Sequence, residues 1–171
     1  LLPIEPQSPG LRERIWWGAG SRATAEWTAQ QGMNLMSSTL LTEDTGVPFH
    51  ELQAEQIHLF RKAWESAGHE RTPRVSVSRS IFPILDERDA AYFGMQGQSR
   101  DQVGMIDGGK ARFGKTYAAE PDVLVEQLRE DQAVAEADTL LLTVPNQLGV
   151  DYNAHVIEGI LTEVAPALGW R

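Results

Sequence analysis

The sequence contains no cysteine, and this absence removes several kinds of chemistry at once. Disulfide bonds, thiolate nucleophiles and cysteine-ligated metals are all excluded. The histidines show neither the HxxxH nor the HExxH spacing of common metal sites, so we expect no metal site. They are His50, His58, His69 and His155. His155, near the start of the last expected helix, is the one that most merits attention, although a packed surface histidine is the favoured interpretation.

Long apolar runs and an excess of positive charge are also missing. No segment approaches the roughly 18–20 apolar residues that cross a bilayer, and no signal peptide is visible. The net charge of −9 argues against broad binding to nucleic acid or to anionic membranes, because both require a basic surface. Together with the lack of cysteine, these features favour a cytoplasmic enzyme. Backbone amides can still bind a phosphate locally, so the acidic total is compatible with a phosphorylated cofactor.

Length and composition are those of one globular domain. The chain has 171 residues, of which 42% are hydrophobic and 23% charged, and this is enough for a single well-buried core. We therefore expect one domain over residues 1–171. The chain begins Leu1-Leu2-Pro3, without a methionine, and residues 1–13 have the composition of a loop. We interpret this start as that of a processed or partial chain.

Hydrophobic periodicity predicts strands that alternate with helices. The expected strands span residues 14–17, 33–38, 74–82 and 138–145, and the expected helices span 51–67, 86–92, 121–136 and 152–164. Residues 138–145 form a nearly continuous apolar run, which is typical of parallel strands that are covered on both faces. Successive strand–helix–strand units require parallel pairing with right-handed crossovers. The predicted fold class is therefore α/β.

One segment, Gly94–Gly114, is unusually rich in glycine. It contains Gly94, Gly97, Gly104, Gly108, Gly109 and Gly114. We expect no regular structure there, and we interpret residues 94–114 as a mobile insertion or lid loop of the kind that closes over enzyme sites.

The segment Arg14–Ser38 packs a strand, a glycine loop, a helix and a second strand into a short stretch. Its loop, Gly18-Ala19-Gly20-Ser21, is too small and flexible to continue the strand. A helix that starts at such a loop presents unpaired N–H groups and the positive end of its dipole, which together favour a phosphate. The loop also satisfies the loose dinucleotide pattern GxGxxA. That interpretation is weaker, because the next strand ends in Ser37-Ser38 rather than in an acidic residue.

These segments together resemble the bacterial luciferase-like flavin monooxygenase family. The resemblance is carried by the GxGS loop, by Glu26-Trp27, by GMNLMSS on the next strand, and by the C-terminal ADTLLLTVPNQLGVDYNAHVIEGILTEVAPALGWR. It implies a parallel (β/α) barrel of TIM type, of which only the second half, about four β/α units, is present. It also implies either a fragment, which we favour, or a half-barrel that forms a homo-oligomer or pairs with a missing N-terminal half.

The resemblance further implies a reaction and a cofactor site. In the family, reduced FMN supplied by a reductase reacts with O2 to give a flavin hydroperoxide, which oxygenates a small organic substrate. Gly20, Ser21 and Thr24 would contact the flavin phosphate. Arg22 would either supply charge or, as an equal alternative, point to solvent; no catalytic residue is indicated. Two alternatives stay open: an F420-dependent oxidoreductase of the same superfamily, and a non-enzymatic flavin-binding half-barrel module.

Arg79 is a further candidate outside this loop. It lies near the carboxyl end of its expected strand, where barrel enzymes place active-site groups. It also shares a strand face with Val77 and Ile81, and a buried arginine requires an anionic partner. The sequence leaves two equal interpretations, a ligand-binding group and a structural ion pair.

Overall fold

The computed structural model describes residues 5–170, so part of the loop expected over residues 1–13 lies outside the described residues. The helices are α1 (Leu11–Arg14), α2 (Arg22–Gln30), α3 (Phe49–Ala67), α4 (Glu87–Phe93), α5 (Pro121–Arg129), α6 (Gln132–Glu136) and α7 (Gly149–Gly159). The strands are β1 (Trp16–Ala19), β2 (Asn34–Ser37), β3 (Leu40–Leu41), β4 (Val75–Arg79), β5 (Ile81–Pro83), β6 (Gln102–Ile106), β7 (Gly109–Phe113), β8 (Tyr117–Ala119) and β9 (Thr139–Leu142).

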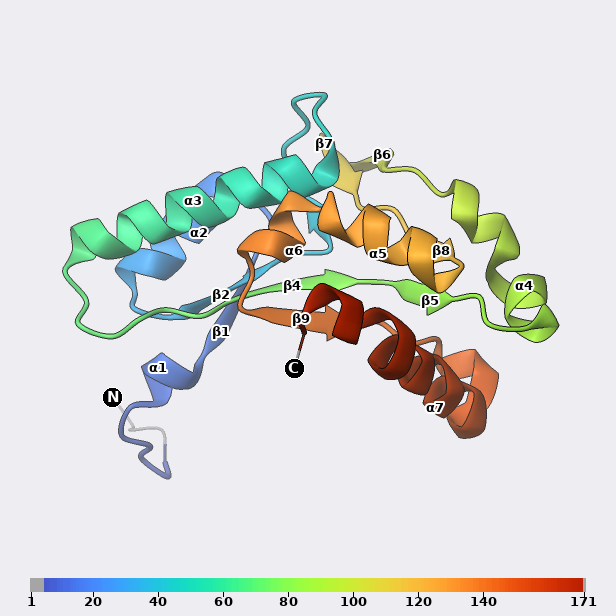
Figure 1. Cartoon of the computed structure of the whole chain (residues 1–171). Coiled ribbons are helices and arrows are strands. Elements are labelled where there is room, and N and C mark those ends of the chain that lie inside the picture. Colours follow the sequence, from blue (N-terminus) through green and yellow to red (C-terminus); the bar gives the residue numbers. More distant parts are fainter. Residues whose placement is uncertain (1–4, 171) are drawn as a thin grey trace.

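A four-stranded parallel sheet forms the centre of the molecule. Its order is β1-β2-β4-β9, and every neighbouring pair is parallel. In Figure 1 the helices α2, α3 and α6 run along one side of this sheet. All four predicted strands are present with shifted bounds, so the prediction of an α/β fold with parallel pairing is confirmed. Closure of these strands into part of a TIM-type barrel stays a prediction.

The two faces of the sheet differ in how well they are covered. Residues in register lie on the same face, and Leu35, Val75 and Val77 are completely buried in a core shared with α2, α3 and α6. On the opposite face, Ser78 is only half-buried and its neighbour Leu141 is 40% exposed. The sheet therefore buries one face against its own helices and leaves the other partly open.

Helix α3 buries one side in the core on this face of the sheet, as its amphipathic pattern predicts. Its buried apolar side includes Ile57, Phe60 and Trp64. Gly68 ends the helix with a φ of +71°, a left-handed conformation that glycine adopts without a Cβ penalty. Burial of an amphipathic face, rather than intrinsic propensity, supplies most of the stability of such a helix.

The first strand begins and ends later than predicted. Residues 11–14 form α1. The Arg14 guanidinium donates hydrogen bonds to the Pro9 carbonyl and the Ser8 hydroxyl, and Arg14 is not part of the strand. Gly18 and Ala19 continue β1, which corrects the expectation that they would interrupt it. The physical reason is the parallel neighbour: Gly18 and Ala19 are in register with β2, whose ladder hydrogen bonds override their low strand propensity.

The glycine-rich segment corrects a second expectation, because residues 102–113 are regular. Residues 94–98 form a 3-10 helix, η1, and β6 and β7 form an antiparallel hairpin that also pairs with β3. The hairpin turn places Asp107 and Gly108 at φ values of +48° and +80°, the signs that a tight two-residue turn requires. The prediction of an irregular loop was wrong here, whereas its interpretation as a mobile lid stays a prediction.

The two C-terminal helices also differ from the predicted ones. The helix expected over 121–136 divides into α5 and α6, because Asp131 caps a new helix by accepting a hydrogen bond from the Val134 N–H. The last helix begins at Gly149 and continues as a π-helix, η3, over Ile160–Val164. Within residues 5–170, none of the helices combines the length and apolar character needed to span a membrane.

Candidate functional site

The predicted phosphate loop lies at the carboxyl end of β1, at the start of α2. Ser21 is the N-cap of this helix, and its Oγ accepts a hydrogen bond of 3.2 Å from the Thr24 N–H. The hydroxyl oxygens of Ser21 and Thr24 are 2.9 Å apart. Gly20 precedes them, and its carbonyl accepts a 2.8 Å bond from the Thr42 N–H. The structure thus brings the predicted residues together at one helix start.

Arg22, the first residue of α2, is held by two carboxylates. Its backbone N–H and its Nη1 both donate to Oε2 of Glu43, at 3.2 and 3.1 Å. Its Nε and Nη2 donate to the two oxygens of Glu55, at 3.1 and 2.7 Å. These hydrogen bonds lower the pKa of Glu55 and, because Glu55 accepts them, raise the pKa of Arg22. This helix start therefore already binds one anionic oxygen, that of Glu43.

The segment that carries Glu43 is connected to the hairpin. Oδ1 of Asp44 accepts hydrogen bonds from Nε of Arg112, at 2.9 Å, and lies 2.8 Å from its Nη2. The hydrogen bond from Arg112 lowers the pKa of Asp44, so the pair is ionic at neutral pH. The residue next to Glu43 is therefore joined to β7 by an ion pair.

A cavity of about 200 Å³ lies elsewhere, and none of the predicted loop residues lines it. Buried Arg79 and Asp131 form its floor as a bidentate pair, with Nε–Oδ2 and Nη2–Oδ1 distances of 2.7 and 2.9 Å. The Tyr117 hydroxyl donates a 2.6 Å hydrogen bond to the same Oδ2. Arg79 thus forms a buried ion pair with Asp131, as one of the two interpretations of the sequence expects, and it also lines the cavity.

Burial and pairing act in opposite directions on these groups. Burial raises the pKa of Asp131, but the bonds and charge of Arg79 outweigh it and hold that pKa below its ordinary value. Burial, together with the charge of Asp131, raises the pKa of the Tyr117 phenol. Tyr117 therefore stays protonated and acts as a hydrogen-bond donor to an ionised carboxylate.

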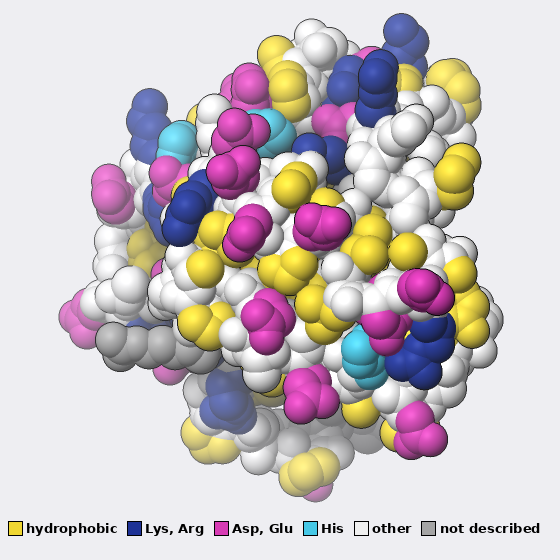
Figure 2. Space-filling view, turned by 45° about the vertical axis from the view of Figure 1, so that its right-hand side comes forward, with side chains coloured by type: hydrophobic (Ala, Val, Ile, Leu, Met, Phe, Trp, Pro, Cys, Tyr) yellow, Lys and Arg dark blue, Asp and Glu magenta, His cyan; other side chains and the backbone are white. Residues whose placement is uncertain are grey.

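The cavity is lined by basic side chains together with one further acidic residue, Asp101. Lys115 places its Nζ 4.7 Å from the Tyr117 ring, and Arg100 and His50 also line the opening. Gly114 permits the close approach of Phe49, because a Cβ there would lie 2.6 Å from that ring. By contrast, Figure 2 shows acidic side chains spread across the middle of one face of the molecule, in keeping with the net charge of −9.

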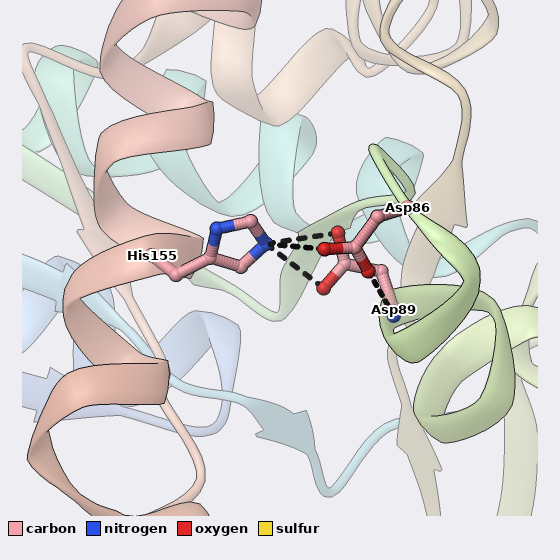
Figure 3. A group of neighbouring side chains, drawn as sticks. All are labelled: Asp86, Asp89 and His155. Atoms are coloured by element: carbon pink, nitrogen blue, oxygen red, sulfur yellow. Dashed lines mark hydrogen bonds and ion pairs between the residues drawn. The ribbon is translucent and has the colours of Figure 1, made fainter.

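A third polar cluster joins α4 to α7. Asp86 and Asp89 belong to the start of α4, and His155 reaches them from α7 (Figure 3). Asp89 is completely buried, and it accepts a 2.6 Å hydrogen bond from the Tyr152 hydroxyl. Burial raises the pKa of Asp89, but the bonds from Tyr152, His155 and the Leu85 N–H outweigh it and lower that pKa overall.

Sequence reasoning missed most partners of the residues that it singled out. Glu55 lies 33 positions from Arg22, and Asp131 lies 52 positions from Arg79, so no local sequence pattern indicates either pair. A signal did exist for two aspartates. Asp86 accepts from the N–H of Asp89 three residues later, which is the spacing of an N-terminal helix cap.

The comparisons with known proteins find likenesses among solved structures. No protein-family model and no curated protein matches the sequence. Among solved structures, monooxygenase RslO1 from Streptomyces bottropensis is similar, with a TM-score of 0.58 and 16% sequence identity over 90% of this chain. The match covers 48% of the RslO1 chain, so this chain spans about half its length. At this identity the likeness shows a shared fold.

Proposed function

We propose that this chain carries the flavin-phosphate site of a luciferase-like monooxygenase, which uses reduced FMN and O2 to oxygenate a small organic substrate. The sequence resemblance and the fold shared with a monooxygenase support the reaction class. The observation that carries the proposal is local: the α2 start already binds an anionic oxygen through a backbone N–H and a guanidinium.

The residues at this helix start fit a phosphate monoester. Ser21 and Thr24 offer hydroxyls that are 2.9 Å apart, and Arg22 offers a guanidinium and the first helix N–H. The helix dipole adds favourable potential for a dianion. A Cβ built at Gly20 would lie in ordinary van der Waals contact, 3.7 Å from the Leu40 carbonyl oxygen. On binding, a phosphate oxygen would take the place of the Glu43 carboxylate.

The chain's own residues would bind and orient the cofactor, while the reduced flavin supplies the chemistry with O2. Ser21 and Thr24 would donate hydrogen bonds to phosphate oxygens, and Arg22 would balance the charge, with Glu55 keeping its guanidinium in place. The partly open face of the sheet, which includes Ser78 and Leu141, supports assembly with a second half that covers it and excludes water.

A titration with two flavins tests the proposal. FMN and riboflavin differ only in the phosphate, so we expect the full chain to bind FMN about tenfold more tightly or better, as judged by flavin fluorescence. Ser21→Asp places a negative charge at the phosphate position and should abolish this preference. Ser66→Asp, on the exposed end of α3, makes the same charge change elsewhere and should leave it intact.

Two results would contradict the proposal. Equal affinities for FMN and riboflavin would mean that the phosphate is not recognised here. An unchanged FMN preference in Ser21→Asp would place the phosphate elsewhere on the chain. A parallel titration with F420 identifies the cofactor class, because preferential F420 binding would favour hydride transfer over oxygenation.

A further inference from the structure

The cluster of Asp86, Asp89 and His155 has a geometry that its role in helix capping does not require. Nε2 of His155 lies 3.0 Å from each carboxylate oxygen of Asp89. It also lies 4.0 Å from Oδ2 of Asp86. One ligand atom from each of the three residues lies within 4.8 Å of the other two, and Figure 3 shows the imidazole pointing at both carboxylates.

The separations of 3.0 and 4.0 Å from Nε2 of His155 fit those of atoms that share a metal ion. Bonds of about 2.0–2.2 Å from a metal to nitrogen and oxygen ligands place neighbouring ligand atoms roughly 3–4 Å apart. One imidazole with two carboxylates is a donor set that suits Zn²⁺ and similar divalent transition ions, whereas Mg²⁺ and Ca²⁺ prefer oxygen alone. We propose that Asp86, Asp89 and His155 bind one such divalent cation.

Hydrogen bonds from neighbouring groups hold both carboxylates in fixed orientations, as such bonds do for the ligands of known metal sites. The Tyr152 hydroxyl donates to Oδ1 of Asp89 at 2.6 Å, and the Leu85 N–H donates to Oδ2 at 3.0 Å. The Asp89 N–H in turn holds Oδ1 of Asp86 at 2.9 Å, which leaves Oδ2 of Asp86 directed toward His155. Ligands that are fixed in this way lose little freedom when the ion binds.

Access and charge also favour a cation. Asp89 is buried, whereas the side chains of His155 and Asp86 are 27% and 47% exposed, so an ion can enter from solvent and keep water ligands. Two carboxylates give the cluster a charge that a divalent ion neutralises. A metal ion at this position would bind the lone pair of Nε2, which faces both carboxylates. The ion would join α4 to α7.

The proposal is tested with Co²⁺ and Zn²⁺ alone, added to the full chain. We expect saturable binding of one equivalent of Co²⁺, seen as visible absorption bands, which Zn²⁺ then displaces. His155→Gln and Asp86→Asn should each weaken binding by about tenfold or more, and Tyr152→Phe, which removes a supporting bond, by about tenfold. His58→Gln is the matched control, because His58 lies 3.1 Å from Glu136 in an exposed pair elsewhere.

A measurement on the unaltered chain tests the proposal without any variant, so misfolding of a variant cannot affect its result. Addition of Zn²⁺ should shift the ring nitrogen resonances of His155 in ¹⁵N spectra and leave those of His58 in place. Absence of saturable binding, unchanged affinity in His155→Gln, or unshifted His155 resonances would each overturn the proposal. Neither experiment involves flavin, so its outcome is independent of the proposed oxygenase function.

Discussion

Arg22 and Arg79 each follow or end a strand of the same sheet and each pair with carboxylates, yet their surroundings differ completely. The side chains of the Arg79–Asp131 pair are 3% and 0% exposed, and Tyr117 completes the bonding of Asp131. The Arg22–Glu43 pair is 30% and 36% exposed. Breaking a buried pair (the sealed pair below) costs several kcal/mol of free energy, so it keeps its partners. A solvent-exposed pair (the open pair) can give up one carboxylate to an incoming anion at little cost. The comparison teaches that burial, not residue type, determines how readily each arginine could exchange its carboxylate for another anion.

The largest expected effect comes from breaking the sealed pair. Asp131→Ala leaves Arg79 buried without its counter-charge and should destabilise the protein by about 3–5 kcal/mol. Urea unfolding measures this change. Glu55→Ala, which breaks the open cluster instead, should cost less than about 1 kcal/mol. Comparable losses of unfolding free energy in Asp131→Ala and Glu55→Ala would contradict the difference that burial is said to make between the two arginine pairs.

Acid should act mainly through the sealed pair. The folded state holds the pKa of Asp131 below its unfolded value, near 3.9 for a free aspartate. Its contribution is therefore complete above that unfolded value and is lost as the pH falls through the lower, folded pKa. Stability measured from about pH 6 to pH 2 should fall more in the wild type than in Asp131→Asn. Parallel pH curves for the two proteins would contradict this assignment.

Tyr117 should matter less than Asp131 but more than any surface group. Tyr117→Phe removes one hydrogen bond to an ionised carboxylate while Arg79 remains, so we expect a loss of about 1.5–3 kcal/mol. Thermal and urea unfolding provide the measurement. Tyr92→Phe, at a tyrosine that is 51% exposed, serves as the control and should change little.

The cap of α2 should contribute about 1 kcal/mol. Ser21→Ala removes the oxygen that accepts from the Thr24 N–H, and the loss of an N-cap typically has this magnitude. The same variant should weaken FMN binding, whereas Ser21→Thr, which keeps the hydroxyl, should retain both properties. A stability change without any change in FMN affinity would confine Ser21 to a structural role.

The smallest effect on stability, and the most informative one on binding, is expected at Glu43. Glu43→Gln should change stability by less than about 1 kcal/mol, because the pair is open to solvent. Removing the competing charge at the helix start should tighten FMN binding by about two- to fivefold. Weaker FMN binding in this variant would show that the carboxylate helps to bind the flavin rather than competes with it.

The sequence predicted the fold class because local signals agree there. Amphipathic periodicity located α3, and the apolar run over 138–145 located the last strand, β9. It failed where tertiary contacts decide: Gly18 and Ala19 are strand residues only because β2 pairs with them. The hairpin of β6 and β7 was missed because its glycines were counted as breakers, although the one in the turn, Gly108, is what allows the strands to pair.

The candidate site divides in the same way. Gly20, Ser21, Arg22 and Thr24 are adjacent in sequence, so their grouping at a helix start was predictable. The carboxylates that bind Arg22 come from distant segments, and so do the Asp131 carboxylate on Arg79 and the His155 imidazole beside Asp89. Such long-range pairs depend on the folded topology and leave no local pattern.

The most direct test of the central claim observes the backbone of the α2 start itself. In ¹H–¹⁵N spectra of the full chain, FMN should shift the amide resonances of Arg22, Ala23 and Thr24, and riboflavin at the same saturation should not. Shifts that are confined to these amides and depend on the phosphate are the result that the proposal predicts. FMN-induced shifts that spare these amides, or that riboflavin reproduces in full, would contradict it.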